Sequence, residues 1–217
     1  MKYDKAIFDI EIGAFKLKIE TFKNLDQTID DLCAGLDEKS SIDPLSEDMC
    51  PYFGVVWPSA LGLGKYLIRH RELIKDKEIL ELGCGLAIPS FIAKFYGANI
   101  LASDFHGDVE GFLKTNQQLN NSFFSYERLN WRDNLKNPKQ FDIVMGSDVL
   151  YESRHPADVA TALLKFVKPG GQVILADPGR SYLQSFVTSM KEFGFKDELE
   201  AIQIEKTDIY VMRFYGK

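Results

Sequence analysis

The chain has 217 residues, a formal net charge of −6 and a sequence pI of about 5.2. Hydrophobic residues make up 45% of it, so it can bury the core of one ordinary α/β domain and is not expected to be disordered. The acidic balance disfavours a nucleic-acid backbone as the main partner. No signal peptide is visible and no apolar run is long enough to span a bilayer, so we expect no membrane association.

The number and spacing of the cysteines and histidines indicate the redox compartment and whether a metal site is expected. An odd number of cysteines without a Cys-x-x-Cys pair argues against a disulfide framework and against zinc; the three are Cys33, Cys50 and Cys84. The three histidines also lack metal-ligand spacing. These patterns predict a reduced, cytoplasmic protein without a metal.

Residues 1–50 are expected to form an N-terminal extension packed on the core. Residues 6–20 alternate apolar and polar side chains around Gly13, which predicts a short β-hairpin. Residues 25–48 are rich in Asp and Glu and predict a helix followed by a loop. We expect this acidic face to be solvated, although an extension that contacts lysine-rich targets would have the same composition.

Residues 51–217 are expected to form the main domain. Pro58 fits the first turn of a helix that starts after Trp57. Strands and helices then alternate, which predicts a three-layer α/β/α architecture with a parallel sheet and an antiparallel C-terminal hairpin. The expected strands lie at about 78–82, 99–103, 124–129, 141–147, 172–176, 198–205 and 208–215. The expected helices lie at about 89–97, 107–120, 156–167 and 181–192, with a turn at Asp177–Arg180.

The most informative segment is a buried strand that ends in the glycine turn Gly83-Cys84-Gly85. Asp104 stands 21 residues after Gly83, at the end of the next strand. A nucleoside-containing cofactor needs this arrangement, because glycines allow close approach and the acid accepts hydrogen bonds from ribose hydroxyls. Ile88 replaces the third glycine of the dinucleotide fingerprint, and Glu81 would repel a phosphate. These features disfavour NAD and fit S-adenosylmethionine, which has a sulfonium and no phosphate.

Acidic residues recur at or near the carboxyl ends of the predicted strands, where open α/β sheets bind ligands: Glu81, Asp104, Asp148 and Asp177. We expect Glu81 to bind the cofactor's ammonium group directly or through water, since a buried acid otherwise needs another partner. Gly83 and Gly85 are expected to pass close to the methionine part, with Cys84 as a small spacer. An N-cap of the next helix is the alternative role of Asp104.

Several motifs resemble those of class I, seven-strand methyltransferases over roughly residues 50–217: Ile79–Gly85, Asp104, Phe141–Asp148 and Lys168–Gly171. The resemblance implies a Rossmann-like fold with a seven-stranded, mostly parallel sheet. A narrower resemblance is to methyltransferase family 16, which holds protein lysine methyltransferases. Its signature after strand four is Asp/Glu-x-x-Tyr/Phe, which Asp148 and Tyr151 match, and Val56-Trp57-Pro58 and Trp131 resemble further family positions.

The resemblance also implies roles for individual residues. Asp148 is expected to bind and orient the acceptor amine and to stabilise the charge formed in transfer, and Tyr151 to bound the acceptor channel. A capping acid and a core tyrosine are the alternatives. The remaining expected cofactor contacts are Trp57, Phe105, Trp131 over the adenine, Asp133 to an adenine nitrogen, and Ser147.

The leading hypothesis is a monomeric N-methyltransferase that methylates a lysine side chain of a partner protein and releases S-adenosylhomocysteine. A small-molecule (nicotinamide-like) or protein-histidine N-methyltransferase is the first alternative. A non-catalytic, cofactor-binding assembly protein is the second. A nucleic-acid amino-methyltransferase is disfavoured, because Asp148-Val149-Leu150-Tyr151 departs from the N/D-P-P-Y/F motif that stacks a flipped base.

Overall fold

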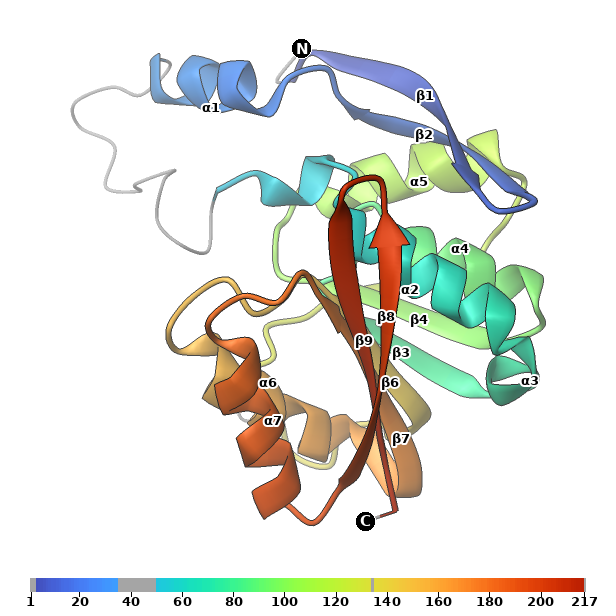
Figure 1. Cartoon of the computed structure of the whole chain (residues 1–217). Helices are drawn as coiled ribbons and strands as arrows, with labels where there is room; N and C mark the ends of the chain where they lie inside the picture. Colours follow the sequence, from blue (N-terminus) through green and yellow to red (C-terminus); the bar gives the residue numbers. More distant parts are fainter. Residues whose placement is uncertain (1–2, 35–49, 134, 217) are drawn as a thin grey trace.

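The computed structural model describes residues 3–34, 50–133 and 135–216 (Figure 1). Most predicted elements are present within a few residues of their expected bounds. The strands are β1 (Lys5–Ile12), β2 (Phe15–Phe22), β3 (Glu78–Leu82), β4 (Asn99–Asp104), β5 (Ser125–Arg128), β6 (Phe141–Ser147), β7 (Val167–Asp177), β8 (Lys196–Ile204) and β9 (Thr207–Tyr215). The helices are α1 (Leu25–Ala34), the 3-10 turn η1 (Tyr52–Gly54), α2 (Pro58–Arg69), α3 (Arg71–Ile74), α4 (Ile88–Phe95), α5 (Val109–Leu119), α6 (His155–Phe166) and α7 (Leu183–Glu192).

A seven-stranded sheet in the order β5-β4-β3-β6-β7-β9-β8 forms the centre of the main domain. The first five strands in this order are parallel, and β9 runs antiparallel to both β7 and β8. This arrangement confirms the predicted fold class, including the antiparallel C-terminal hairpin. Among the described residues, none of the helices is long and apolar enough to cross a bilayer.

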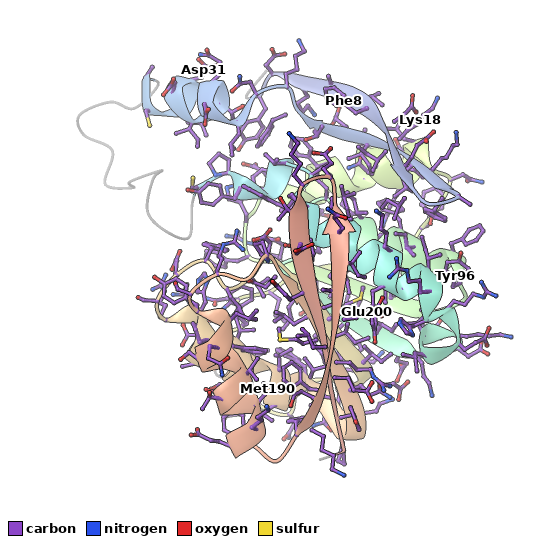
Figure 2. The ribbon with its side chains drawn as sticks, viewed as in Figure 1. Phe8, Lys18, Asp31, Tyr96, Met190 and Glu200 are labelled. Atoms are coloured by element: carbon purple, nitrogen blue, oxygen red, sulfur yellow. The ribbon has the colours of Figure 1, made fainter. Side chains whose placement is uncertain are left out.

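Side chains that alternate along each buried strand pack against opposite layers of helices. Ile79 on β3 belongs to the core with α2, α4 and α5, whereas its neighbour Leu80 belongs to the core with α6 and α7. Met190, labelled in Figure 2, is a fully buried residue of that second core. The two cores therefore place one helical layer on each face of the sheet (Figure 1).

The strand order reverses between β3 and β6, which are parallel neighbours in the sheet. From β3 the chain continues outward to β4 and β5, and from β6 it continues in the opposite direction to β7. Such a switch point opens a crevice at the carboxyl ends of the strands. The loops that follow Leu82 and Ser147 therefore face one another across this crevice.

The predicted N-terminal hairpin is present as a separate two-stranded sheet that packs on α5. The Asn116 side chain accepts from the backbone N–H of Glu20 at 2.7 Å and donates to its carbonyl at 3.3 Å. Asn120 makes the same pair of contacts with Lys18, at 2.9 and 2.8 Å. Two side-chain amides thus hydrogen-bond to the backbone groups of β2 that face away from β1. The loop predicted after the acidic helix lies outside the described residues.

Two local features differ from the sequence-based expectation. The short helix α3 follows α2 directly, whereas no separate element was expected there. Residues Lys168–Gly171 fall within the bounds of β7, but β7 pairs with β6 at Val167 and then only from Gln172, so these four residues lie in a register shift opposite Phe141 and Ile143. Gly170 has a φ of +74° within this irregular stretch, and the run paired with β6 from Gln172 to Ala176 matches the strand expected at 172–176.

Candidate active site

A cavity of about 410 Å³ lies at the carboxyl ends of the strands, within the size range of small-molecule sites. Loops after β3, β4, β5, β6 and β7 contribute to it, together with η1 and the start of α2. All the predicted site residues line this cavity except Glu81 and Asp133. The cavity also includes residues that the sequence did not identify, among them Tyr52, Phe53, His106, Asn130, Arg132 and His155.

The glycine turn after β3 is a tight wall of the cavity in which side chains would not fit. Gly83 has a φ of +62°, and a Cβ there would lie 2.9 Å from Cγ1 of Val149. Gly85 has a φ of +49°, and a Cβ there would lie 3.0 Å from the carbonyl oxygen of Phe53. Both positions therefore need glycine for backbone conformation and for close packing within the protein. The turn is held close to the loop after β6 and to η1, and the cavity lies between them.

Asp104 ends β4 and closes the glycine turn from the other side. One carboxylate oxygen accepts the backbone N–H of Gly85 at 2.9 Å, and the other accepts the N–H of His106 at 2.9 Å. Burial raises the pKa of this carboxyl, and the backbone N–H groups partly offset that effect. The alternative role as the N-cap of α5 is wrong, because the helix starts at Val109 after Asp108. Asp104 is therefore positioned at the cavity, with its orientation fixed by the loops on both sides.

Glu81 lies beneath the cavity wall and does not line it. Its Oε2 accepts the backbone N–H of Ser90 at 3.1 Å and also the Ser90 hydroxyl. Ser90 is in the first turn of α4, so the carboxylate satisfies that helix N-terminus. This geometry therefore does not support the predicted direct contact with a cofactor ammonium, because the Glu81 carboxylate is hydrogen-bonded to Ser90 within the protein. Its other oxygen, Oε1, is buried and has no hydrogen-bond partner among the described residues. Burial raises the pKa of Glu81 to about 8.

Cys84 lies between the two glycines and is buried. Its backbone N–H donates to the carbonyl of Ser103 at 2.9 Å, which ties the turn to β4. Burial raises the pKa of the Cys84 thiol well above its usual value, with Asp104 and Glu81 adding to the effect. The thiol therefore stays protonated, and the structure gives it the properties of the small spacer that was expected.

An aromatic wall closes the cavity on the η1 side. The rings of Phe53 and His106 have centroids 4.3 Å apart, and both residues line the cavity. Phe53 packs further against Phe22 of the hairpin at 5.4 Å and against Phe112 of α5 at 5.5 Å. The N-terminal hairpin thus supports the cavity wall from behind. The sequence carried no local signal for this wall, because its members are brought together only by tertiary packing.

Trp131 lines the cavity as predicted, whereas Asp133 does not. A Cβ on Gly83 would lie 3.4 Å from the Trp131 ring, and that ring makes an edge contact with His155 at 5.9 Å. Asp133 is exposed, and its backbone carbonyl accepts from Lys165 at 3.2 Å. The chain turns away after Trp131, since the N–H of Asp133 donates to the carbonyl of Asn130 at 3.0 Å. Asn130 and Arg132 therefore line the cavity where Asp133 was expected.

Asp148 follows β6 with an unusual backbone conformation that fixes its side chain at the cavity. Its φ is +61°, and its N–H donates to the carbonyl of Ala176 on β7 at 2.9 Å. A non-glycine residue in this left-handed region is strained, and such strain is concentrated at functional sites. The side chain is 8% exposed and forms an ion pair with Arg180. Burial raises the pKa of Asp148, and the Arg180 guanidinium and the Ser59 hydroxyl partly offset that effect.

The turn after β7 brings Arg180 into the cavity wall. Oδ1 of Asp177 accepts the backbone N–H groups of Gly179 at 2.8 Å and Arg180 at 2.7 Å. Its Oδ2 accepts from Arg180 Nη1 at 3.3 Å. The expected turn at Asp177–Arg180 is present, but it also places a guanidinium between Asp148 and Asp177. The ion pair joins residues 32 positions apart along the chain, which a turn motif alone does not reveal.

Aromatic side chains form a rim beside Asp148. Tyr52 makes edge contacts with Trp57 at 6.2 Å and with Tyr151 at 6.0 Å. Tyr151 also contacts His155, with the ring centroids 4.5 Å apart. The Trp57 Nε1–H donates to the carbonyl of Tyr52 at 2.9 Å, which fixes the indole at the start of α2. This rim, comprising Tyr52, Trp57 and Tyr151, gives the cavity an apolar entrance next to a carboxylate.

The chain matches one protein-family model, described as lysine methyltransferase, over residues 45–193. A histone-arginine methyltransferase, METTL23, of Xenopus laevis is 32% identical over 116 residues, which cover 51% of this chain and 50% of that protein. An electron transfer flavoprotein beta subunit lysine methyltransferase of Rattus norvegicus is 29% identical over 153 residues, which cover 66% of this chain and 55% of that protein. The chain thus spans about half the length of the curated relatives it matches.

Solved structures support the fold independently. A magnesium protoporphyrin IX methyltransferase from Synechocystis PCC 6803, solved with bound S-adenosylmethionine, has a TM-score of 0.60 at 14% identity. The match covers 82% of this chain and 86% of that chain. At this identity the likeness shows a shared fold and no shared acceptor. The fold and the family predicted from the sequence are both confirmed.

Proposed function

The chain belongs to the lysine methyltransferase family, and from this premise we propose that it transfers a methyl group from S-adenosylmethionine to the side-chain amine of a lysine in a partner protein. The observation that carries the proposal is the position of Asp148 in the same cavity as Asp104 and the glycine turn. A cytoplasmic, monomeric enzyme that acts on a protein substrate is part of the same proposal.

The residues of the cavity fit the cofactor. Asp104 can accept from ribose hydroxyls with oxygen lone pairs that Gly85 and His106 leave available. The glycine turn lets a ligand approach the backbone closely. Residues 83–88 include no lysine or arginine that would bind a pyrophosphate as a Walker-type lysine does. The orphaned Oε1 of Glu81, buried behind this turn, can hold a water that reaches toward an ammonium group. When bound, the cofactor supplies an electrophilic methyl group on a positively charged sulfur.

The residues of the rim and of the loop after β6 prepare the acceptor. The Asp148 carboxylate can accept an N–H of the lysine amine and orient its lone pair along the line of attack. It also stabilises the positive charge that forms on nitrogen as the N–C bond forms and the S–C bond breaks. Tyr52, Trp57 and Tyr151 exclude water from the amine and favour its cationic product through their ring faces.

One observation favours a second acceptor, the guanidinium of an arginine side chain. Asp148 and Asp177 already hold a guanidinium, that of Arg180. Planar guanidinium groups match carboxylates well, so the acid of this site suits arginine as well as lysine. The two acceptors are distinguished by acid hydrolysis of the labelled product, which releases methyllysine in one case and methylarginine in the other.

The proposal is tested by methyl transfer from labelled S-adenosylmethionine into the proteins of a cell lysate. The wild-type protein is compared with Asp148→Asn and with Asp9→Asn, a matched change at an exposed position of β1. We expect protein bands that wild type and Asp9→Asn label and that Asp148→Asn labels at least about 100-fold more weakly. Label that appears only in the low-molecular-weight fraction would replace the proposal with a small-molecule methyltransferase. Cofactor binding without any transfer would support the non-catalytic alternative.

A further inference from the structure

The guanidinium of Arg180 occupies the place beside Asp148 that a cationic acceptor would take. Its Nη1 forms an ion pair with Oδ1 of Asp148 and lies 3.3 Å from Oδ2 of Asp177. Arg180 lines the cavity and is 30% exposed, whereas the Asp177 side chain is fully buried. One nitrogen is thus shared between two carboxylates, one of which faces the cavity and one of which lies behind it.

The backbone of Arg180 is held independently of its guanidinium. Asp177 Oδ1 accepts the N–H groups of Gly179 and Arg180, so the turn keeps its shape whichever carboxylate the side chain contacts. Gly179 has a φ of +85°, and a Cβ there would lie 2.8 Å from the Tyr210 ring. The turn is therefore rigid, and the long side chain of Arg180 is the part that can move.

Within the cluster of Asp148, Asp177 and Arg180, two carboxylates share one guanidinium. From other elements, the hydroxyl of Ser59 on α2 interacts with Asp148. Arg132 after β5 and His155 at the start of α6 line the same cavity, and His155 pairs with Glu152. The Asp148 side chain is only 8% exposed, so its carboxylate is costly without a cationic partner, and a single cation satisfies it.

We propose that Arg180 is an internal counter-ion that the cationic acceptor displaces from Asp148. In the free protein the guanidinium bridges both carboxylates. When the acceptor enters, Arg180 keeps its ion pair with Asp177 and loses its ion pair with Asp148, and the acceptor amine then pairs with Asp148. This inference rests on the proposed function for the identity of the acceptor, and it assigns Arg180 as a positioning residue that selects for a single positive charge.

The test uses n-butylamine, which carries the end of a lysine side chain, and the full chain in complex with S-adenosylhomocysteine. Binding of butylammonium at pH 8 is followed by NMR, through the carboxyl carbon of Asp148 and the Nε–H of Arg180. The signals are assigned by their absence in Asp148→Asn and Arg180→Lys. Arg180→Gln removes the counter-ion, Arg180→Lys keeps the charge, and Arg69→Gln is the matched control. Arg69 forms an ion pair with Glu200 on β8, labelled in Figure 2, away from the cavity lining.

We expect Arg180→Gln to bind butylammonium at least about threefold more tightly than wild type, because its competitor for Asp148 is gone. Arg180→Lys and Arg69→Gln should stay within twofold of wild type on the same scale. In wild type the Arg180 Nε–H signal should shift in proportion to butylammonium bound. With an active protein acceptor, the acidic limb of kcat/KM should move up by at least about one pH unit in Arg180→Gln and stay in place in Arg180→Lys.

Weaker or unchanged butylammonium binding by a folded Arg180→Gln would overturn the inference. If that variant does not fold, the wild-type titration decides, because an Arg180 signal that stays constant while the amine binds excludes displacement. An absence of saturable amine binding to wild type would also overturn it. Failure of the proposed function looks different, since the amine would then bind as expected while no protein in the lysate is labelled.

Discussion

The Asp104 carboxylate accepts the backbone N–H of Gly85 at 2.9 Å, and this hydrogen bond ties the end of β4 to the glycine turn after β3. The second carboxylate oxygen fixes the N–H of His106, whose ring packs on Phe53. A single side chain therefore sets the geometry of three segments that line the cavity. The same side chain is the expected ribose acceptor, so we expect cofactor binding and loop geometry to depend on one residue.

Replacement of Asp104 by Asn should weaken S-adenosylmethionine binding by about 10- to 100-fold, because hydrogen bonds to a charged acceptor contribute about 1.5–3 kcal/mol. The amide can still accept one backbone N–H but cannot accept from both loops and the ribose. Isothermal titration calorimetry measures the change, with Asp9→Asn as a surface control. Equal affinity of the two variants for S-adenosylmethionine would mean that Asp104 does not bind the cofactor.

Replacement of Gly85 by Ala should lower the free energy of unfolding by about 1–2 kcal/mol, because an L residue at positive φ is strained. The added Cβ would also press on the carbonyl of Phe53. Gly111 is the matched control, since it lies on an exposed face of α5 with nothing within 4 Å of the position of a Cβ. Gly111→Ala should instead gain about 0.5–1 kcal/mol. Urea unfolding measures the free energy of unfolding of both variants. A similar change at the two positions would mean that position 85 does not require glycine.

Ionisation of Glu81 should lower the free energy of unfolding as pH rises. Its folded pKa is raised by burial to about 8, above the ordinary value of 4.5, so the folded protein binds the proton more tightly than the unfolded chain. The stabilisation is complete below about pH 4.5 and is lost progressively until about pH 8. Relative to Glu81→Gln, wild type should lose about 1.4 kcal/mol for each pH unit in that interval.

The measurement is urea unfolding of wild type and Glu81→Gln at several values between pH 5 and pH 9. Their difference isolates the contribution of this carboxyl from those of the other titratable groups. Parallel stability curves for the two proteins would mean that Glu81 is ionised in the folded state, with Ser90 and a water as sufficient partners.

Replacement of Asn116 by Ala should loosen the N-terminal hairpin from α5. The Asn116 side chain is fully buried and pairs with both backbone groups of Glu20, so its loss leaves a donor and an acceptor without partners. The expected cost is about 1–3 kcal/mol. Asn120→Ala removes the same contacts to Lys18 at a half-buried position and should cost less, because water can replace them. Hydrogen exchange of the β2 amides and urea unfolding distinguish the two, and an equal or reversed order would contradict the role of Asn116.

Local patterns in the sequence were sufficient for most of the fold. Short, mostly apolar runs located β3 and β6, and Gly83 and Gly85 marked a turn that needs positive φ. These signals depend on a few neighbouring residues. The Asp148 motif was placed correctly because it follows directly from the end of a predicted strand.

Contacts between distant segments could not be predicted in the same way. Glu81 was expected to face a ligand, but the orientation of α4 brings Ser90 to it. Asp133 was expected at the adenine, but a turn at Asn130 directs it to solvent. The contact of Arg180 with Asp148 exists because β6 and β7 are neighbours in the sheet, so their following loops meet. Strand order therefore decides the partners of the acids, whereas the local pattern decides only where the acids lie.

Lysine methylation by this protein is tested by mass spectrometry of a proteome treated with the protein and with S-adenosylmethionine that carries a heavy methyl group. We expect heavy methyl groups on the ε-nitrogen of lysines in one or a few proteins, present with wild type and absent with Asp148→Asn. Heavy methyl groups on no protein side chain, from a wild-type protein that binds the cofactor, would contradict this expectation.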